Sequence, residues 1–490
     1  MLNQIRKEMK SQEMNELVRS ENGAFMFKTS GQNLLDMNFR VASYRRASEN
    51  KILNDWKKAF ADDPELAIKW LFYVRDVREG LGERQLFRTI ANYLSGTEPR
   101  FWKLINFIPE YGRWDDILRL HKNFVTNAIK SQLELDQEAM AKNKPISIMA
   151  KWLPSVNTSS KEKRNLARNL AKELGLTERN YRKTLAKMRD YLDVIEVKTS
   201  GGKWNEINYE TVPSQANLKY KTAFFKHDEE RRREFLGKLE KGEVKINAST
   251  TFPHDIIHQY NHNRRTIDQA LEGMWKSLPN YGIENTLVVA DGSGSMTSSI
   301  PGSNATALEV ANALAIYCSE RNSGEFKNKY ITFSENPKFV DFSNAKNLLQ
   351  KIHTAESHNE VANTNIYKVF KLVLDTAVKN KMKQEDFAKN ILIISDMEFD
   401  QGASNANESL FTKIAKEYAS AEYDLPRLIF WNVNSRTGAV PVNQNKLGVA
   451  LVSGFSVHIA KMVMSGQLCP FEALKEVLMS DRYKDITLGE

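Results

Sequence analysis

Apolar residues in the first part of the chain recur every three to four positions, in segments separated by short breaks rich in Gly, Pro, Ser and Thr. In the segment PELAIKWLFYVRDVRE, for example, Leu66, Trp70 and Tyr73 share one helical face behind Pro64. This spacing, with Pro at the start, predicts an amphipathic helix. Residues 1–280 therefore read as a series of helices, and paired helices in such a series are typical of an irregular α-helical solenoid.

The pattern changes after Pro279, where short apolar runs of strand composition alternate with amphipathic helical segments such as ATALEVANALAIYCSER. The runs are residues 286–290, 329–334, 338–342, 390–395, 427–433 and 448–454. Alternation of this kind predicts an α/β doubly wound domain over residues 281–490. Ligands of such sheets bind at the carboxyl ends of the strands.

The composition is that of a globular protein, with 41% hydrophobic and 27% charged residues in 490. No apolar run approaches the roughly 20 residues that cross a bilayer, and the first residues have no apolar signal core. We therefore expect a cytoplasmic monomer with no membrane partner. The two cysteines, Cys318 and Cys469, argue against a disulfide framework or a cysteine zinc site.

The positive charge lies in the first part of the chain. Residues 1–280 hold 49 Lys and Arg against 37 Asp and Glu, whereas residues 281–490 hold 21 against 24. A basic region favours a polyanionic partner, because neutralising phosphates releases counterions. The alternative is a solvated helical surface.

Two groups of basic residues are candidates for phosphate contact. The segment RDVREGLGERQLFR concentrates four arginines around a glycine turn. An ion-pair network with Asp76, Glu79 and Glu83 that holds two helices together is an alternative role for them. The second group lies mainly on two successive helices, which also carry Lys172 and Lys187. Its last member lies in a polar segment beside Trp204, and this tryptophan either stacks on a base or anchors the loop. The candidates are Arg75, Arg78, Arg84 and Arg88 in the first group, and Arg164, Arg168, Arg182, Lys183 and Lys203 in the second.

The segment LVVADGSGSM places an Asp and two serines after the first strand of the second part. It lacks the third Gly of a dinucleotide loop and the Gly-Lys-Ser/Thr of a phosphate loop. A nucleophile elbow would need Gly two residues on either side of Ser293, and it is absent. What remains is a set of hard oxygen ligands, Asp291, Ser293 and Ser295, which suits Mg²⁺ or Mn²⁺.

This Asp-x-Ser-x-Ser pattern resembles the metal-ion-dependent adhesion site (MIDAS) of the von Willebrand factor A domain. The resemblance implies two further contributors, Thr364 in ANTNIYKVF and Asp396 in LIISDMEFD. It also implies that the hydroxyls of Ser293, Ser295 and Thr364 contact the ion directly, while the two carboxylates act through water. One position on the ion is then open to a carboxylate from an acidic protein partner.

The first part of the chain contains the phrases LFYVRDVREGLGERQLFR, PEYGRWDDIL and YRKTLAKMRDYLDVIE. They resemble an uncharacterised family that joins a helical region to a von Willebrand A domain. That architecture is similar to the Ro ribonucleoprotein autoantigens, whose TROVE helical repeats form a ring closed by the A domain. The resemblance implies binding of small noncoding RNAs and of single-stranded RNA ends.

We therefore expect an RNA-binding protein of the ribonucleoprotein type, and not an enzyme. One alternative is a protein-interaction scaffold whose metal site recruits an acidic partner without RNA. A second alternative is a nuclease. Such an enzyme would need a second cluster of carboxylates for a two-metal site, and the sequence does not offer one.

Three histidines share one face of the segment TFPHDIIHQYNHNRR, at positions i, i+4 and i+8. His254, His258 and His262 could hold zinc, but the Glu of the metalloprotease motif is missing and no cysteine lies nearby. The alternative is a polar helix face that meets the following domain or RNA.

Overall fold

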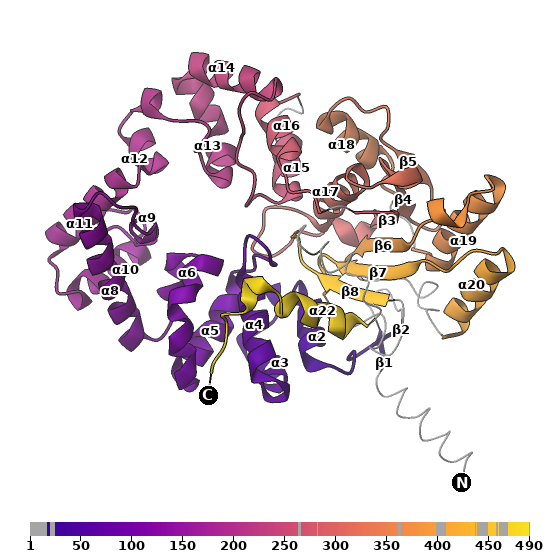
Figure 1. Cartoon of the computed structure of the whole chain (residues 1–490), viewed down its shortest axis with the longest axis horizontal. Helices are drawn as coiled ribbons and strands as arrows, with labels where there is room; N and C mark the ends of the chain where they lie inside the picture. The colour runs from indigo at the N-terminus through magenta and orange to yellow at the C-terminus, as the bar shows by residue number, and fades with distance from the viewer. Residues whose placement is uncertain are drawn as a thin grey trace, which may run out of the picture. The chain divides into compact units, whose positions relative to one another are not determined.

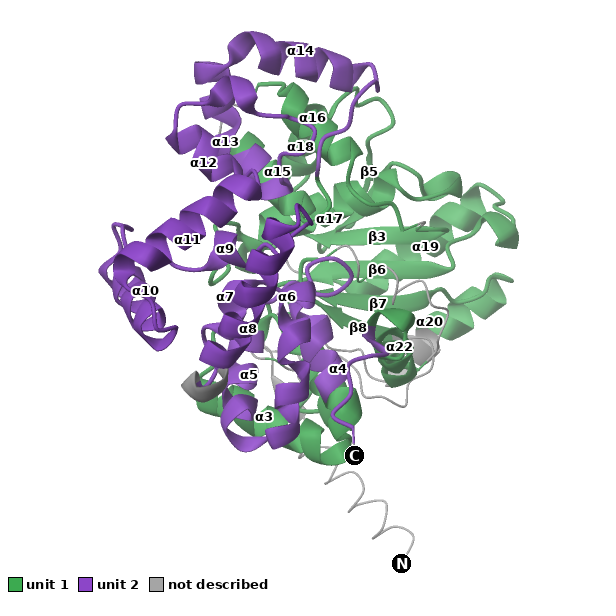
Figure 2. Ribbon diagram, turned by 60° about the vertical axis from the view of Figure 1, so that its left-hand side comes forward, with its two compact units in different colours: residues 1–67, 248–482 green, residues 68–247, 483–490 purple. Residues whose placement is uncertain are grey.

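The computed structural model divides the chain into two compact units (Figure 2). Unit 1 contains residues 1–67 and 248–482, and unit 2 contains residues 68–247 and 483–490. The compact units therefore do not follow the domain boundary predicted near residue 280. The residues that the structure describes are 17–19, 25–262, 266–281, 283–360, 364–397, 408–436, 438, 449–456, 459 and 469–489.

Unit 1 is built around a six-stranded mixed sheet with the strand order β5-β4-β3-β6-β7-β8 (Figure 1). Only β5 runs antiparallel to its neighbour. Each of the six apolar runs of the sequence forms one of these strands, which confirms a helical region followed by an α/β sheet. The strands are β3 (Thr286–Asp291), β4 (Lys329–Phe333), β5 (Phe339–Asp341), β6 (Asn390–Ser395), β7 (Arg427–Asn432) and β8 (Val449–Ser453).

The centre of the sheet is buried on both faces, since every residue of β3 is buried. Strands of a parallel sheet covered on both sides read as continuous apolar runs, which explains LVVA in β3 and ILII in β6. Helix α17 (Ala307–Glu320) packs across β3, β4 and β6, and α19 (Ile366–Lys379) packs on β4. The other α-helices that the structure describes after β3 are α18 (Leu348–Ser357), α20 (Glu408–Ser420) and α22 (Pro470–Leu478).

The N-terminal segment belongs to unit 1, although its pattern grouped it with the helical region. It contains the short hairpin β1 (Leu17–Arg19) and β2 (Phe25–Phe27), then α2 (Asn33–Phe39) and α3 (Glu49–Asp62). Helix α2 packs against β8 and α22. The Asn432 side chain donates to the carbonyl of Phe39 (2.9 Å), so a residue at the end of β7 holds the end of α2.

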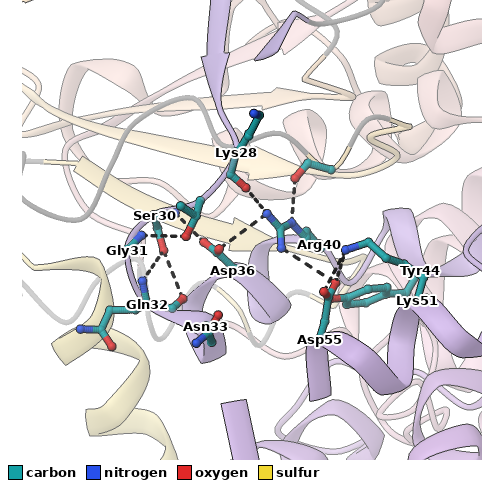
Figure 3. Close-up of polar contacts among 12 residues, drawn as sticks. Lys28, Ser30, Gly31, Gln32, Asn33, Asp36, Arg40, Tyr44, Lys51 and Asp55 are labelled. Atoms are coloured by element: carbon teal, nitrogen blue, oxygen red, sulfur yellow. Dashed lines mark hydrogen bonds and ion pairs between the residues drawn. The ribbon is translucent and has the colours of Figure 1, made fainter. Parts of the chain in front are cut away.

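Arg40 is the centre of a polar network that joins this segment to the sheet unit (Figure 3). Its guanidinium lies 3.6 Å from the carboxylate of Asp36 and 3.9 Å from that of Asp55, and its Nε donates to the carbonyl of Gly438 (2.9 Å). The Tyr44 hydroxyl donates to Asp55 (2.9 Å). Burial, followed by the charge of Asp55, raises the pKa of Tyr44, which therefore remains a neutral donor.

Two further helices from the predicted helical region also belong to unit 1. They are α15 (Pro253–His262) and α16 (Gln269–Lys276), and α15 packs directly along α17. The indole nitrogen of Trp275 donates to the carboxylate of Glu320 on α17 (2.6 Å). Apolar faces shared with α17 therefore bind residues 248–280 to the sheet.

Unit 2 is a succession of helices linked by short turns, as the apolar spacing predicts. Helix α4, whose residues from 68 onward belong to this unit, begins at Pro64 and buries Leu66, Trp70 and Tyr73 on one face. The helices are α4 (Pro64–Arg75), α5 (Gln85–Thr97), α6 (Ile108–Tyr111), α7 (Trp114–Ile117), α8 (Lys122–Ala141), α9 (Met149–Trp152), α10 (Lys161–Glu173), α11 (Glu178–Tyr191), α12 (Ile195–Ser200), α13 (Ser214–His227) and α14 (Glu229–Glu240), with the 3-10 helix η2 (Pro99–Phe107) after α5. None of the described helices is both long and apolar enough to span a membrane.

The last residues of the chain pack on the helices of unit 2. The ring of Tyr483 stacks on Tyr111 at 5.6 Å between centroids, and its hydroxyl donates to the buried Asp76 (3.1 Å). Lys69 donates to the carbonyl of Tyr483 (2.5 Å). Residues 483–489 therefore contribute to the core of unit 2.

A buried carboxylate, Asp116, joins several elements of unit 2. Its Oδ2 accepts from Arg75 Nε (2.8 Å) and from the backbone N–H of Arg113 (3.0 Å), while its Oδ1 accepts from Arg88 Nε (2.6 Å). Asp116 and Arg75 are both fully enclosed. Gly112 lies against this pair, because a Cβ at that position would lie 2.6 Å from Asp116 Oδ2 and 2.8 Å from Arg75 Nε.

We expect Gly112→Ala to lower the free energy of unfolding of unit 2 by about 1–3 kcal/mol, because the added methyl group overpacks a buried ion pair. Urea unfolding of the full chain measures the change. Gly237→Ala on α14 is the matched control, since its Cβ would meet nothing within 4 Å. Alanine in a helix should stabilise by roughly 0.5–1 kcal/mol there, and equal effects of the two substitutions would contradict the packing argument.

Candidate polyanion-binding and metal-binding sites

The first predicted group of phosphate-binding arginines is largely engaged within unit 2. Arg75 is 1% exposed and pairs with Asp116, so its guanidinium is not available to a phosphate. Arg88 binds both Asp115 (3.0 Å) and Asp116 (2.6 Å). These two arginines are therefore held in ion pairs with Asp115 and Asp116, whereas the sequence suggests Asp76, Glu79 and Glu83 as the partners. The carboxylates that bind them follow 27 to 41 positions later in the chain, which sequence spacing could not reveal.

The other two arginines of this group lie at the surface. Arg78 donates from Nη1 to the carbonyl of Glu110 (2.5 Å), which ties the turn after α4 to α6. Arg84 is exposed, and partial desolvation together with the positive charges of Arg113 and Arg75 lowers its pKa to about 10. Neither Arg78 nor Arg84 takes part in an ion pair among the residues that the structure describes, whereas Arg75 and Arg88 both do.

The second predicted group lies mainly on the hairpin of α10 and α11. Ser160 and Thr177 cap the two helices by accepting the backbone N–H of Lys163 and Asn180. On α11 the apolar residues Tyr181, Leu185 and Met188 are buried. The opposite side of α11 carries exposed cations at i, i+3, i+4 and i+8, which we call the basic face: Arg179, Arg182, Lys183 and Lys187.

No ion pair involves the basic face within the part of the chain that the structure describes. Arg182 and Lys183 are predicted residues, and their environment is compatible with a bound anion. Arg179 is a further member, and its spacing of four residues before Lys183 is the sequence signal that identifies it. Between residues 161 and 191, ten basic residues stand against four acidic ones, so the hairpin as a whole is positive.

The other predicted residues of the second group have structural partners. Arg164 donates to the carbonyls of Thr158 (2.7 Å) and Ser159 (2.9 Å) ahead of α10. Arg168 lies 3.2 Å from Glu178 and links the two helices of the hairpin, and Lys203 lies 3.4 Å from Glu206.

Trp204 anchors its loop within unit 2. Its ring stacks on His227 at 4.5 Å between centroids and contacts Phe224 edge to face. The ring face that stacks on His227 is thus already occupied. The sequence left open whether this residue stacks on a base or holds the loop, and the packing favours the second role.

The predicted metal loop follows β3 at the carboxyl edge of the sheet. Asp291 is buried, and its Oδ1 accepts the backbone N–H of Ser293 (2.9 Å). Its Oδ2 accepts the hydroxyl of Ser395 (2.6 Å) at the end of the neighbouring parallel strand β6. These two bonds fix the turn of the loop and join the ends of β3 and β6.

The two serine hydroxyls of the loop lie side by side, with Ser293 Oγ 3.0 Å from Ser295 Oγ. Adjacent ligands on an octahedral Mg²⁺, each at 2.0–2.1 Å, lie about 2.9 Å apart. The hydroxyl pair therefore has the separation of two neighbouring corners of such a site. The hard oxygen donors also suit this ion.

The remaining two predicted ligands are buried on unit 1. Asp396 follows β6 directly and is fully enclosed, and Thr364 is 3% exposed just before Asn365, which caps α19. A shallow pocket beside the loop is lined by Gly292, Thr332, Ser334 and the segment 358–360. The carboxyl ends of two adjacent parallel strands, β3 and β6, thus carry the two acidic residues of the predicted site, as expected for a doubly wound sheet.

These features define a protein with a helical unit and a six-stranded α/β unit. Comparison with family models gives its family: the model for the domain of unknown function DUF2828 matches residues 20–106 and 115–280. This is half of the chain, and the protein belongs to the DUF2828 family. The model for the domain of unknown function DUF7788 matches residues 285–485. The chain is also 29% identical to "Uncharacterized protein L728" of Acanthamoeba polyphaga mimivirus, over 94% of this chain and 86% of that protein.

The family predicted from the sequence is therefore wrong. The matching models are DUF2828 and DUF7788, and neither the TROVE family of the Ro proteins nor the von Willebrand A family is among them. The short phrases of the helical region and the Asp-x-Ser-x-Ser loop suggested the resemblance. Phrases of this length reflect local helix packing and a turn at a strand end, which unrelated families can share.

We expect the stabilising effect of Asp115 in the arginine network to depend on pH. Burial disfavours its charge, but hydrogen bonds from Arg113 and the charges of Arg113 and Arg88 outweigh this and lower its pKa below the usual 3.8. A lowered folded-state pKa contributes stability above the unfolded value that is lost as pH falls through the folded value. The free-energy difference between wild type and Asp115→Asn should therefore be full above about pH 5 and shrink below about pH 4.

Urea unfolding at several pH values measures this difference. Asp190→Asn on α11 is the control, because Asp190 is exposed and accepts no side-chain hydrogen bond among the described residues. Its difference from wild type should stay near zero at every pH. A constant difference for Asp115→Asn would show that the carboxylate charge contributes nothing.

Proposed function

We propose that this protein binds RNA through phosphate contacts on the basic face of α11, and that it does not act as an enzyme. The observation that carries the proposal is the set of exposed cations on one side of a well-packed helix, which form no ion pair among the residues that the structure describes. The charge excess of residues 1–280 supports it, because phosphate binding is driven largely by counterion release.

The extent of the basic face sets the size of the contact. Arg179 and Lys187 are eight residues apart, which is about 12 Å along a helix. Successive phosphates of one strand are about 3.4 Å apart along a helical axis, so the face reaches roughly three or four nucleotides. The aromatic residues Trp204 and Tyr209, which follow α11 in the sequence, are engaged within unit 2, which favours backbone contact over base recognition.

The arrangement of the helices supports a scaffold role for unit 2. The pairs α10–α11 and α13–α14 each pack as neighbours in sequence and in space. We take these pairs as HEAT-like elements of a solenoid, in which each pair buries its apolar face and leaves a polar face for ligands.

We also propose that unit 1 holds Mg²⁺ or Mn²⁺ at the loop after β3. Ser293, Ser295 and Thr364 would supply hydroxyl ligands, and Asp291 and Asp396 would act through water molecules. A bound ion would offer its open position to a carboxylate of an acidic protein partner. The separation of the two serine hydroxyls is the observation that supports this part of the proposal.

Removing the basic face should weaken RNA binding and its dependence on salt. We expect replacement of Arg179, Arg182, Lys183 and Lys187 by Gln to lower affinity for a single-stranded RNA. The slope of log K against log salt should fall by about 2–3 units, at about 0.7 per phosphate contact. Fluorescence anisotropy at several salt concentrations measures both quantities.

A control variant removes the same number of charges from another surface of unit 2. Arg233, Lys238, Lys241 and Lys245 are exposed, on α14 and just after it. Their replacement by Gln should leave the slope close to that of the wild type. Equal losses in the two variants would mean that net charge alone drives binding, and no binding at low salt would favour the protein-scaffold function.

Mg²⁺ should raise the melting temperature of the wild-type chain relative to chelator, because a ligand that binds only the folded state stabilises it. We expect Ser295→Ala to abolish this shift while leaving the metal-free melting temperature unchanged, since Ser295 is only partly buried. Ser299→Ala, at an exposed position four residues later, is the control and should retain the shift. A shift that survives in Ser295→Ala would place the ion elsewhere.

A further inference from the structure

Two histidines of α15 and a glutamate of α17 meet on the surface of unit 1. His258 and His262 are one helical turn apart, and their rings lie 4.1 Å from each other between centroids. Glu309 is in the first turn of α17 and faces both of them. One ligand atom from each of the three residues can be chosen so that all lie within 4.8 Å of one another.

The separations match those of ligands around a tetrahedral ion. Two ligands that each lie 2.0–2.1 Å from a tetrahedral Zn²⁺ are about 3.3 Å apart. His258 Nδ1 lies 3.3 Å from Glu309 Oε1, and His262 Nε2 lies 3.9 Å from the same oxygen. The first distance fits without movement, and a small rotation of the exposed His262 ring would close the second.

We propose that His258, His262 and Glu309 bind a zinc-class divalent transition-metal ion between α15 and α17. Two imidazoles and one carboxylate suit Zn²⁺ better than Mg²⁺, which prefers oxygen ligands alone. The site is distinct from the loop after β3 in both residues and ligand chemistry.

The carboxylate is already held in place by groups other than the histidines. Its Oε2 accepts the backbone N–H of Thr306 (3.0 Å) in a capping box at the start of α17. Its Oε1 accepts the side-chain amide of Asn261 (3.0 Å), which leaves a lone pair on the same oxygen for an ion. Hydrogen bonds of this kind orient metal-binding carboxylates and reduce the entropy lost on binding.

The third histidine of the sequence stripe does not take part. His254 is 4% exposed, stacks on Phe252 and contacts Phe455 edge to face. Its burial lowers its pKa, so it is a neutral core residue. The third ligand comes instead from Glu309, 47 residues beyond His262, where no sequence spacing would indicate it.

The site has a solvent-facing side. Because the His262 side chain is 63% exposed, a fourth ligand, a water molecule or a group from another molecule, can reach an ion there. An ion would also join α15 to α17 and so stabilise unit 1 against unfolding.

The test uses full-length protein that has been treated with chelator and dialysed. It is titrated with Zn²⁺ in the presence of excess Mg²⁺, because Mg²⁺ saturates sites made of oxygen ligands. Isothermal titration calorimetry gives the stoichiometry and affinity. We expect one Zn²⁺ per chain at this site, and at least tenfold weaker binding in His262→Gln and in Glu309→Gln. Glu309→Gln keeps a side chain that can serve in the capping box.

His353→Gln is the matched control, since His353 is an exposed histidine on α18. It should bind Zn²⁺ like the wild type. His262→Gln should melt at the wild-type temperature without metal but should lose the increase that Zn²⁺ produces. Wild-type protein that binds no Zn²⁺, or equal affinities of wild type and His262→Gln, would overturn the proposal, and the cluster would then be an ordinary ion pair.

Discussion

A carboxylate removed from water needs several hydrogen-bond donors, and this constraint organises the polar interior of both units. Asp116 takes donors from Arg75, Arg88 and the backbone of Arg113, and thereby joins the end of α4, α5 and α7 in unit 2. Asp291 takes donors from its own loop and from Ser395, and thereby joins the ends of two strands in unit 1. In each case the elements that donate hydrogen bonds to the carboxylate are held together at that point.

The same constraint separates structural cations from available ones. A buried arginine that satisfies a buried carboxylate cannot also bind a phosphate, and removing either partner would leave an uncompensated charge. Among the described residues, the cations of the basic face of α11 have no such role, whereas Arg189 on the same helix donates to the carbonyls of Ala150 and Leu153. The cations of the basic face extend from the polar side of a helix whose opposite side packs through Tyr181, Leu185 and Met188, so their charges remain in solvent. Exposed cations of this kind distinguish a surface that can bind a polyanion from a sequence that is only rich in Lys and Arg.

Unit 1 combines two groups of potential metal ligands with different chemistry. The loop after β3 offers hydroxyl and carboxylate oxygens, whereas the α15–α17 contact offers imidazoles with one oxygen. Hard and borderline ions prefer these sets differently, so the two sites need not compete for one metal. The loop after β3 continues a strand of the sheet, and the second group lies on α15 and α17, which pack against each other. Regular elements of this kind keep ligands in position.

The sequence alone determined that a helical region precedes a region of alternating strands and helices, because the period of apolar residues reflects which side of an element is buried. It located the six strands and the start of α4 at Pro64. It also predicts a metal-binding loop at Asp291, and this stays a prediction. The tertiary structure alone decided which charges are free, since Arg75 finds Asp116 across 41 residues and His262 finds Glu309 across 47. It also assigned the N-terminal helices to the sheet unit and the last residues to the helical unit. Contacts between segments that are distant in the sequence depend on tertiary packing, and the spacing of residues along the chain does not indicate them.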